Sequence, residues 1–149
     1  MAARSRLDPG PVPEPIQAMG IDDDYVSLLV NTFYGRVRQN PEIGPIFENA
    51  IGDNWDHHLA KLKDFWASVA WGAGRYFGQP VPAHARHPEI EARHFDIWLG
   101  LFRQTLEDTA PTPEAVEHFM VRANRIAKSL KLVLFGVPGF GGPLHAPSA

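Results

Sequence analysis

Histidines are the residues of this sequence best suited to ligand chemistry, and His58 has the most informative surroundings. His58, Leu62, Phe65 and Val69 share one stripe of a 3.6-residue helix. The neighbouring His57 lies about 100° away, on the polar face. An inward-facing histidine is either a core residue with satisfied ring nitrogens or a polar group beside a bound ligand, and the stripe alone leaves both interpretations open. The residues that flank the stripe are Trp55, Leu59 and Trp66.

The sequence has no cysteine, so any metal would be held by its seven histidines and its carboxylates. A di-iron carboxylate site needs two Glu-x-x-His motifs, and the chain has one match, Glu91 to His94. A haem site needs one imidazole on one side of the ring and an apolar, aromatic pocket with a few hydrogen-bond donors on the other. Nine phenylalanines and four tryptophans could line such a pocket. His84, His87 and His94 are all candidate ligands, and the residue pattern does not choose among them.

The composition argues against several classes of protein. The length of 149 residues suits one domain with a single core. A net charge of −3 and scattered Lys and Arg residues predict no binding to nucleic acid or to anionic membranes. No apolar stretch reaches the roughly 18 residues of a membrane span, and residues 1–10 lack the apolar segment of a signal peptide, so we expect a cytoplasmic protein.

Apolar periodicity predicts an all-α chain in which four main helices position these residues. The expected helices cover about residues 22–39, 54–73, 88–107 and 113–135. We expect one helical turn near 45–50 and another near 83–86, because proline and glycine interrupt both stretches. Residues 1–20 are rich in proline and residues 136–149 in glycine and proline, so we expect a flexible leader and tail around a domain at 21–135.

The order and spacing of several short motifs resemble those of a known family. These motifs are Phe33–Arg38, Gly44–Ile51, Trp55–His58, Asp64–Trp66, Tyr76–Pro80 and Trp98–Phe102. Together they resemble the group III truncated haemoglobins of bacteria over about residues 21–135. The resemblance implies a shortened globin, which is a two-over-two helical sandwich around haem b with the proximal segment reduced to a short turn.

The resemblance also implies roles for individual residues. The proximal ligand of the iron would be His84, and the distal histidine, tyrosine and tryptophan would be His58, Tyr34 and Trp98. His84 would bind iron through Nε2 while its other ring nitrogen donates to a backbone carbonyl. Tyr34 and Trp98 would donate hydrogen bonds to a partly negative dioxygen, and His58 could swing between the pocket and solvent.

Three more residues are candidates for contact with the cofactor. Phe47 and Leu62 would press on the haem ring, and Lys61 would pair with a haem propionate. We therefore expect a haem-binding globin that reversibly binds dioxygen or another diatomic gas and that depends on an unidentified reductant. The same site could instead turn over peroxide or nitric oxide, with the distal residues supplying protons and stabilising charge. A cofactor-free helical interaction module is the third interpretation.

Overall fold

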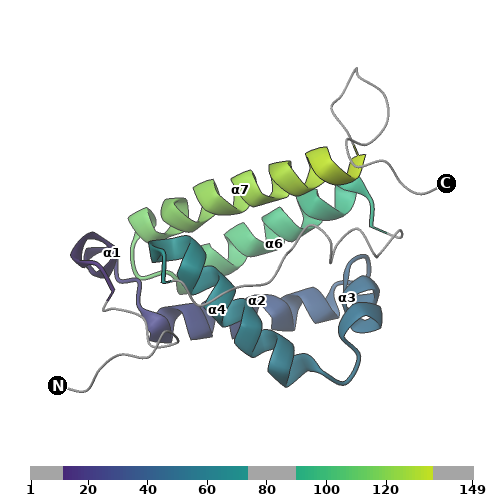
Figure 1. Cartoon of the computed structure of the whole chain (residues 1–149), viewed down its shortest axis with the longest axis horizontal. Coiled ribbons are helices and arrows are strands. Elements are labelled where there is room, and N and C mark those ends of the chain that lie inside the picture. Colours follow the sequence, from purple (N-terminus) through teal and green to yellow (C-terminus); the bar gives the residue numbers. More distant parts are fainter. Residues whose placement is uncertain (1–11, 74–89, 136–149) are drawn as a thin grey trace.

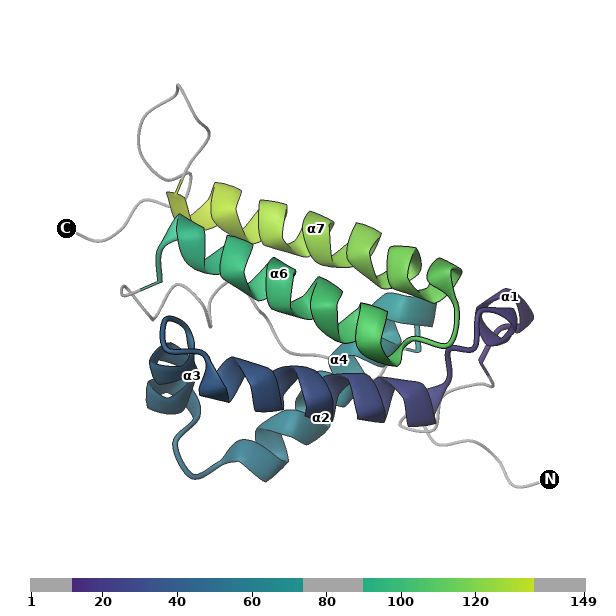
Figure 2. The same ribbon diagram turned by 180° about the vertical axis from the view of Figure 1, so that it is seen from behind.

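The chain folds into two stacked pairs of helices (Figure 1). The computed structural model describes residues 12–73 and 90–135, and every regular element in these ranges is a helix. The helices are α1 (Glu14–Ala18), α2 (Asp23–Gln39), α3 (Gly44–Ile51), α4 (Trp55–Trp71), α6 (Ala92–Thr109) and α7 (Pro113–Phe135). One pair is α2 crossed by α4, and the other is α6 lying antiparallel to α7, with α2 packed against α6 (Figure 2). This arrangement confirms the predicted all-α, two-over-two sandwich.

Local sequence signals set the ends of α2 and α4. The Asp22 carboxylate accepts a hydrogen bond from the Tyr25 backbone N–H at 2.8 Å and caps the first turn of α2. At the other end, the Asn40 side chain accepts hydrogen bonds from two following backbone N–H groups, at 2.8 and 3.1 Å. Gly72 has a φ of +70° and ends α4 in the left-handed conformation, which glycine adopts without steric cost. The predicted bounds of both helices agree with the structure to within two residues.

The start of α6 differs from the prediction. Pro88 and Glu89 predicted the first turn, but the helix begins at Ala92. The His94 Nδ1 atom accepts a hydrogen bond from the Glu91 backbone N–H at 2.8 Å. The first backbone N–H groups of a helix have no partner within the helix, and a side chain that accepts from one of them favours a helix start at that point. Here that side chain is His94, so the helix starts later in the chain than Pro88 predicts.

Within residues 12–73 and 90–135, two short helices add to the four long ones that the sequence predicts. α1 lies within residues 1–20, where we expected a flexible leader, and Ile16 and Met19 pack against the core. The Thr112 hydroxyl, just before α7, donates to the Met19 carbonyl at 2.6 Å and holds this segment in place. α3 has eight residues where we expected a single turn. The predicted turn at 83–86 and the predicted tail at 136–149 lie outside the described residues.

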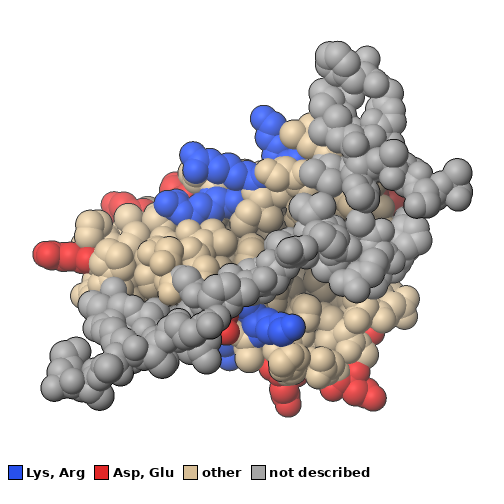
Figure 3. Space-filling view, viewed as in Figure 1, with Lys and Arg blue, Asp and Glu red and all other residues tan. Residues whose placement is uncertain are grey.

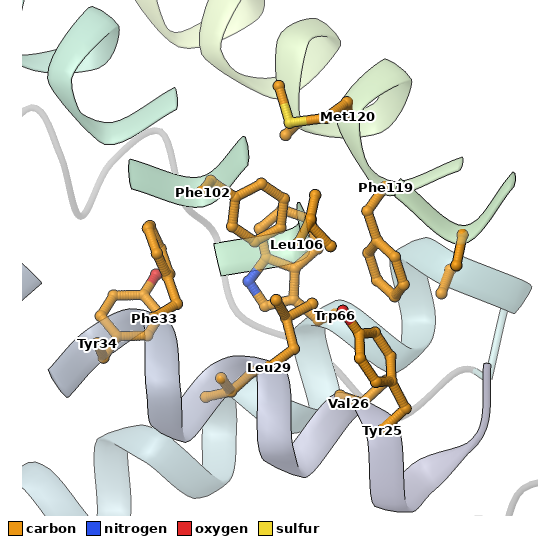
Figure 4. Packing of buried hydrophobic residues seen from close by; sticks show 14 of the residues in the cluster. Tyr25, Val26, Leu29, Phe33, Tyr34, Trp66, Phe102, Leu106, Phe119 and Met120 are labelled. Atoms are coloured by element: carbon orange, nitrogen blue, oxygen red, sulfur yellow. The ribbon is translucent and has the colours of Figure 1, made fainter. Parts of the chain in front are cut away.

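Aromatic rings form the centre of the core (Figure 4). Phe33 of α2, Trp66 of α4, Phe102 of α6 and Phe119 of α7 are fully buried. Trp66 stacks on Phe102 with ring centroids 4.7 Å apart, and Phe33 meets Phe102 edge-on at 5.0 Å. Trp66 also contacts Phe119, at 6.2 Å. One set of ring contacts therefore joins the four long helices.

Charged side chains of both signs lie on the face shown in Figure 3. Most of the Lys and Arg side chains follow the upper edge of this view, and Asp and Glu side chains lie at the left end and along the lower edge. None of the described helices combines the length and the apolar character that crossing a bilayer requires.

Gly44, at the start of α3, lies directly against the end of α2. A Cβ atom at this position would lie 2.7 Å from the Arg38 carbonyl oxygen and 3.0 Å from that of Val37. At the exposed Gly35 of α2, a Cβ atom would meet nothing within 4 Å.

We expect Gly44→Ala to lower the free energy of unfolding by about 1–3 kcal/mol, because the backbone of α2 would have to move. The control, Gly35→Ala, should raise it by about 0.5–1 kcal/mol, because alanine loses less conformational entropy in a helix. Urea denaturation measures both changes. A Gly44→Ala protein as stable as the parent would contradict the close contact between α2 and α3.

Candidate functional site

Tyr34, near the end of α2, points into the sandwich. It follows Val30 by one helical turn on the buried face and retains 4% exposure. Its ring lies 4.7 Å from Phe33, 5.8 Å from Phe47 of α3 and 6.5 Å from Trp55 of α4, measured between centroids. The Tyr34 ring is therefore in contact with α3 and with the start of α4.

Trp98 of α6 is half-buried and belongs to the aromatic core. Its indole is nearly parallel to the Phe102 ring, at 5.5 Å and 6°, and it stacks on Trp66 of α4 at 6.1 Å. Phe33 meets Trp98 edge-on at 5.5 Å. Because Phe33 also contacts Tyr34, one phenylalanine links the two predicted hydrogen-bond donors.

His58 of α4 is half-buried and meets the Trp55 indole edge-on at 6.4 Å. Burial lowers the pKa of the His58 imidazole, and the nearby charges of Lys61 and His57 lower it further. The imidazole is therefore neutral at pH 7 and can both donate and accept a hydrogen bond. Since Trp55 also contacts Tyr34, all three predicted distal residues belong to one group of touching rings.

α4 carries two inward rows that differ in burial. Trp66 and Ala70 are fully buried against other helices. Leu62 and Val69, in the row that contains His58, are apolar but only half-buried, as is Phe47 of α3. Half-buried apolar side chains beside a phenol, an indole and an imidazole fit a flat, largely apolar cofactor such as haem.

The other predicted site residues that the structure describes do not belong to this group of rings. Lys61 is exposed on α4. His94 is buried and caps α6 through Nδ1, so the structure assigns it a structural role. His84 and His87 lie outside the described residues, and the proximal ligand therefore stays a prediction. Within residues 12–73 and 90–135, no group of three His, Cys, Asp or Glu residues could hold a metal ion, so the di-iron interpretation has no support there.

Comparison with known proteins decides the family. The sequence model of the bacterial-like globin family matches residues 17–132. The chain belongs to this family of globins. It is 35% identical over 122 residues to the group 3 truncated haemoglobin ctb of Campylobacter jejuni, over 80% of this chain and 95% of that protein. The crystal structure of a group III truncated haemoglobin from Campylobacter jejuni aligns with a TM-score of 0.74 and 35% identity, covering 82% of this chain and 95% of that one.

A more distant relative is the group 2 truncated haemoglobin YjbI of Bacillus subtilis. It is 26% identical over 125 residues, which cover 78% of this globin and 86% of YjbI. The matches confirm the resemblance to group III truncated haemoglobins. They support a globin-type haem-binding function for the chain.

The sequence did not identify the residues that link the predicted distal residues in the fold. From the sequence alone, Phe33 is a core residue and Trp55 and Trp66 merely flank the His58 stripe. In the fold each of them contacts a predicted distal residue. The sequence did contain a hint of these contacts, because Phe33 directly precedes Tyr34 and Trp55 lies one helical turn before His58.

We expect NMR titration to give the His58 imidazole a pKa below 6.5, because the folded chain disfavours the imidazolium. The free energy of unfolding should not depend on this group above about pH 6.5 and should fall below that pH, because the unfolded chain binds the proton more readily. Lys61→Gln should raise the pKa of His58 only part of the way back toward 6.5, because burial lowers this pKa more than the charge of Lys61 does. Lys63→Gln is the matched control. A pKa of 6.5 or higher in the parent would contradict the burial of His58.

Proposed function

We propose that this globin binds haem b with His84 as the proximal ligand of the iron, and that it reversibly binds dioxygen or another diatomic gas. Membership of the family supports haem binding in general. The observation that carries the finer proposal is the ring network that brings Tyr34, His58 and Trp98 together from three helices. Haem iron, when bound, supplies the coordination position for a diatomic gas.

The chain itself supplies hydrogen-bond donors and an apolar boundary. In this proposal the Tyr34 hydroxyl and the Trp98 indole N–H donate to a gas molecule that carries partial negative charge. The neutral His58 offers a further donor and can swing toward solvent. Phe47 and Leu62 contribute half-buried apolar surface that contacts the cofactor ring and keeps water away from the donors.

Lys61 and His84 would complete the proposed haem site. The ammonium group of Lys61 is exposed near His58 and is suited to pairing with a haem propionate. His84 would bind iron through Nε2, and its other nitrogen would donate to a backbone carbonyl and fix the tautomer. Reversible binding of dioxygen needs ferrous iron, so the proposal includes a reductant as a partner.

The proximal assignment is tested by His84→Ala. We expect the purified parent protein to show a Soret band and the variant to lose most of it, because no other imidazole would hold the iron at that position. His87→Ala, three residues along the chain, is the control and should keep the spectrum. An unchanged spectrum for His84→Ala would rule out this ligand, and a colourless parent reconstituted with haem would rule out the function.

The distal assignment is tested by Tyr34→Phe and Trp98→Phe. Each should raise the rate constant for dioxygen dissociation by about 5- to 150-fold, which corresponds to the loss of a hydrogen bond of about 1–3 kcal/mol. Stopped-flow displacement measures the rate. Tyr25→Phe is the control, because its hydroxyl lies 2.9 Å from the Thr109 hydroxyl at the other end of α2.

Unchanged dissociation in both distal variants would contradict the assignment. Steady-state turnover of peroxide or nitric oxide that is lost on replacement of His58 or Tyr34 would favour an enzyme over a reversible gas binder.

A further inference from the structure

Trp55, the first residue of α4, sits between two of the proposed distal residues. Its indole retains 6% exposure. It lies 6.4 Å from the His58 imidazole, nearly edge-on at 82°, and 6.5 Å from the Tyr34 phenol. Any displacement of this indole therefore changes what both rings contact.

The indole N–H of Trp55 has no hydrogen-bond partner among the described residues, although it is buried. A buried donor without an acceptor lowers stability, because its hydrogen bond to water is lost without replacement. Contacts to the faces and edges of the ring must offset this cost. Two of these contacts are aromatic, with the rings of Tyr34 and His58.

One member of an ion pair, Arg38, lies over the Trp55 ring. The Arg38 guanidinium carbon lies 4.4 Å from the centroid of the indole, in a cation–π contact. Arg38 Nε in turn donates to Glu48 Oε1 at 2.7 Å. We call Arg38 and Glu48 the latch. Because Arg38 is on α2 and Glu48 is on α3, the latch joins the end of α2, α3 and the start of α4, which lie close together in Figures 1 and 2.

We propose that Trp55 is a positioning residue that holds Tyr34 and His58 in the gas-binding pocket, and that the latch keeps Trp55 in place. This inference rests on the function proposed above. Arg38 and Glu48 are 45% and 42% exposed, so the latch contributes little to overall stability and can open without unfolding the chain. Opening it frees the indole on its charged side and gives gas a wider path to Tyr34.

Proton exchange at the Trp55 indole reports the latch without any need for the cofactor. We expect Glu48→Gln and Arg38→Gln to speed exchange of this N–H by about two- to fivefold, the range that an exposed cation–π contact supports. Arg38→Lys keeps a cation over the ring and should restore part of the protection. Exchange is followed by ¹⁵N NMR. The Trp66 indole N–H, buried in the core, is the internal reference for global opening.

A second exposed ion pair provides the matched control. Arg93 Nη1 lies 2.6 Å from Glu42 Oε2, with exposures of 54% and 50%, whereas the cation over the Trp55 ring is Arg38. Glu42→Gln removes the same kind of charge and should leave Trp55 exchange unchanged. The proposed role of the latch would be wrong if Glu42→Gln and Glu48→Gln changed the exchange rate of the Trp55 indole N–H equally. It would also be wrong if Glu48→Gln sped exchange at Trp55 and Trp66 by the same factor.

The link to the pocket is tested by flash photolysis of the carbon monoxide complex. In Glu48→Gln the rate of carbon monoxide rebinding from solvent should rise by about two- to fivefold, as for indole exchange. The C–O stretching band should broaden or shift, because Tyr34 and His58 are held less firmly. Faster indole exchange with unchanged rebinding and an unchanged band would overturn the positioning role and leave the proposed function intact. A parent protein that binds no gas would contradict the proposed function instead, while indole exchange would still report on the latch.

Discussion

The packing of Phe33 against Trp98 and Phe102 is the contact on which the rest of this arrangement depends. Phe33 comes from α2, the other two rings come from α6, and Trp66 of α4 stacks on the same pair. Protein cores are as dense as organic crystals, so interlocked rings leave few alternative positions for three helices. Because Tyr34 follows Phe33 directly, the same packing that stabilises the sandwich also sets where the phenol lies relative to the indole.

Polar contacts between α2 and α6 accompany this packing. Arg36 donates to the Thr105 hydroxyl at 3.3 Å and pairs with Asp108 at 2.8 Å, with exposures of 35% and 43% for the two charged side chains. Exposed pairs of this kind contribute little free energy. Thr105 is fully buried, and its hydroxyl also donates to the Leu101 carbonyl at 2.8 Å, so no donor is left unpaired there. Burial of the rings therefore contributes more to the stability of this interface than the exposed ion pair does.

Features that depend on a few neighbouring residues could be predicted from the sequence. The caps at Asp22 and Thr112, the glycine stop at Gly72 and the periodicity of the apolar residues give helix bounds close to those observed, because capping and helical repeat are local. The roles predicted for Tyr34 and Trp98 came from the resemblance to a family, because the apolar stripe alone predicts a core residue at both positions. The family comparison then confirmed the resemblance.

Tertiary structure decided which of these residues meet. From the sequence, α4 has one inward stripe, but packing against α2 and α7 buries the row of Trp66 fully and leaves the row of His58 half-buried. Docking of α1 on the core and the contact of Trp55 with Tyr34 and His58 likewise appear only when distant segments come together. The sequence by itself determined the four long helices and the residue types that face inward, whereas packing decided which residues touch, because contacts between distant residues depend on how all the rings fill one core together.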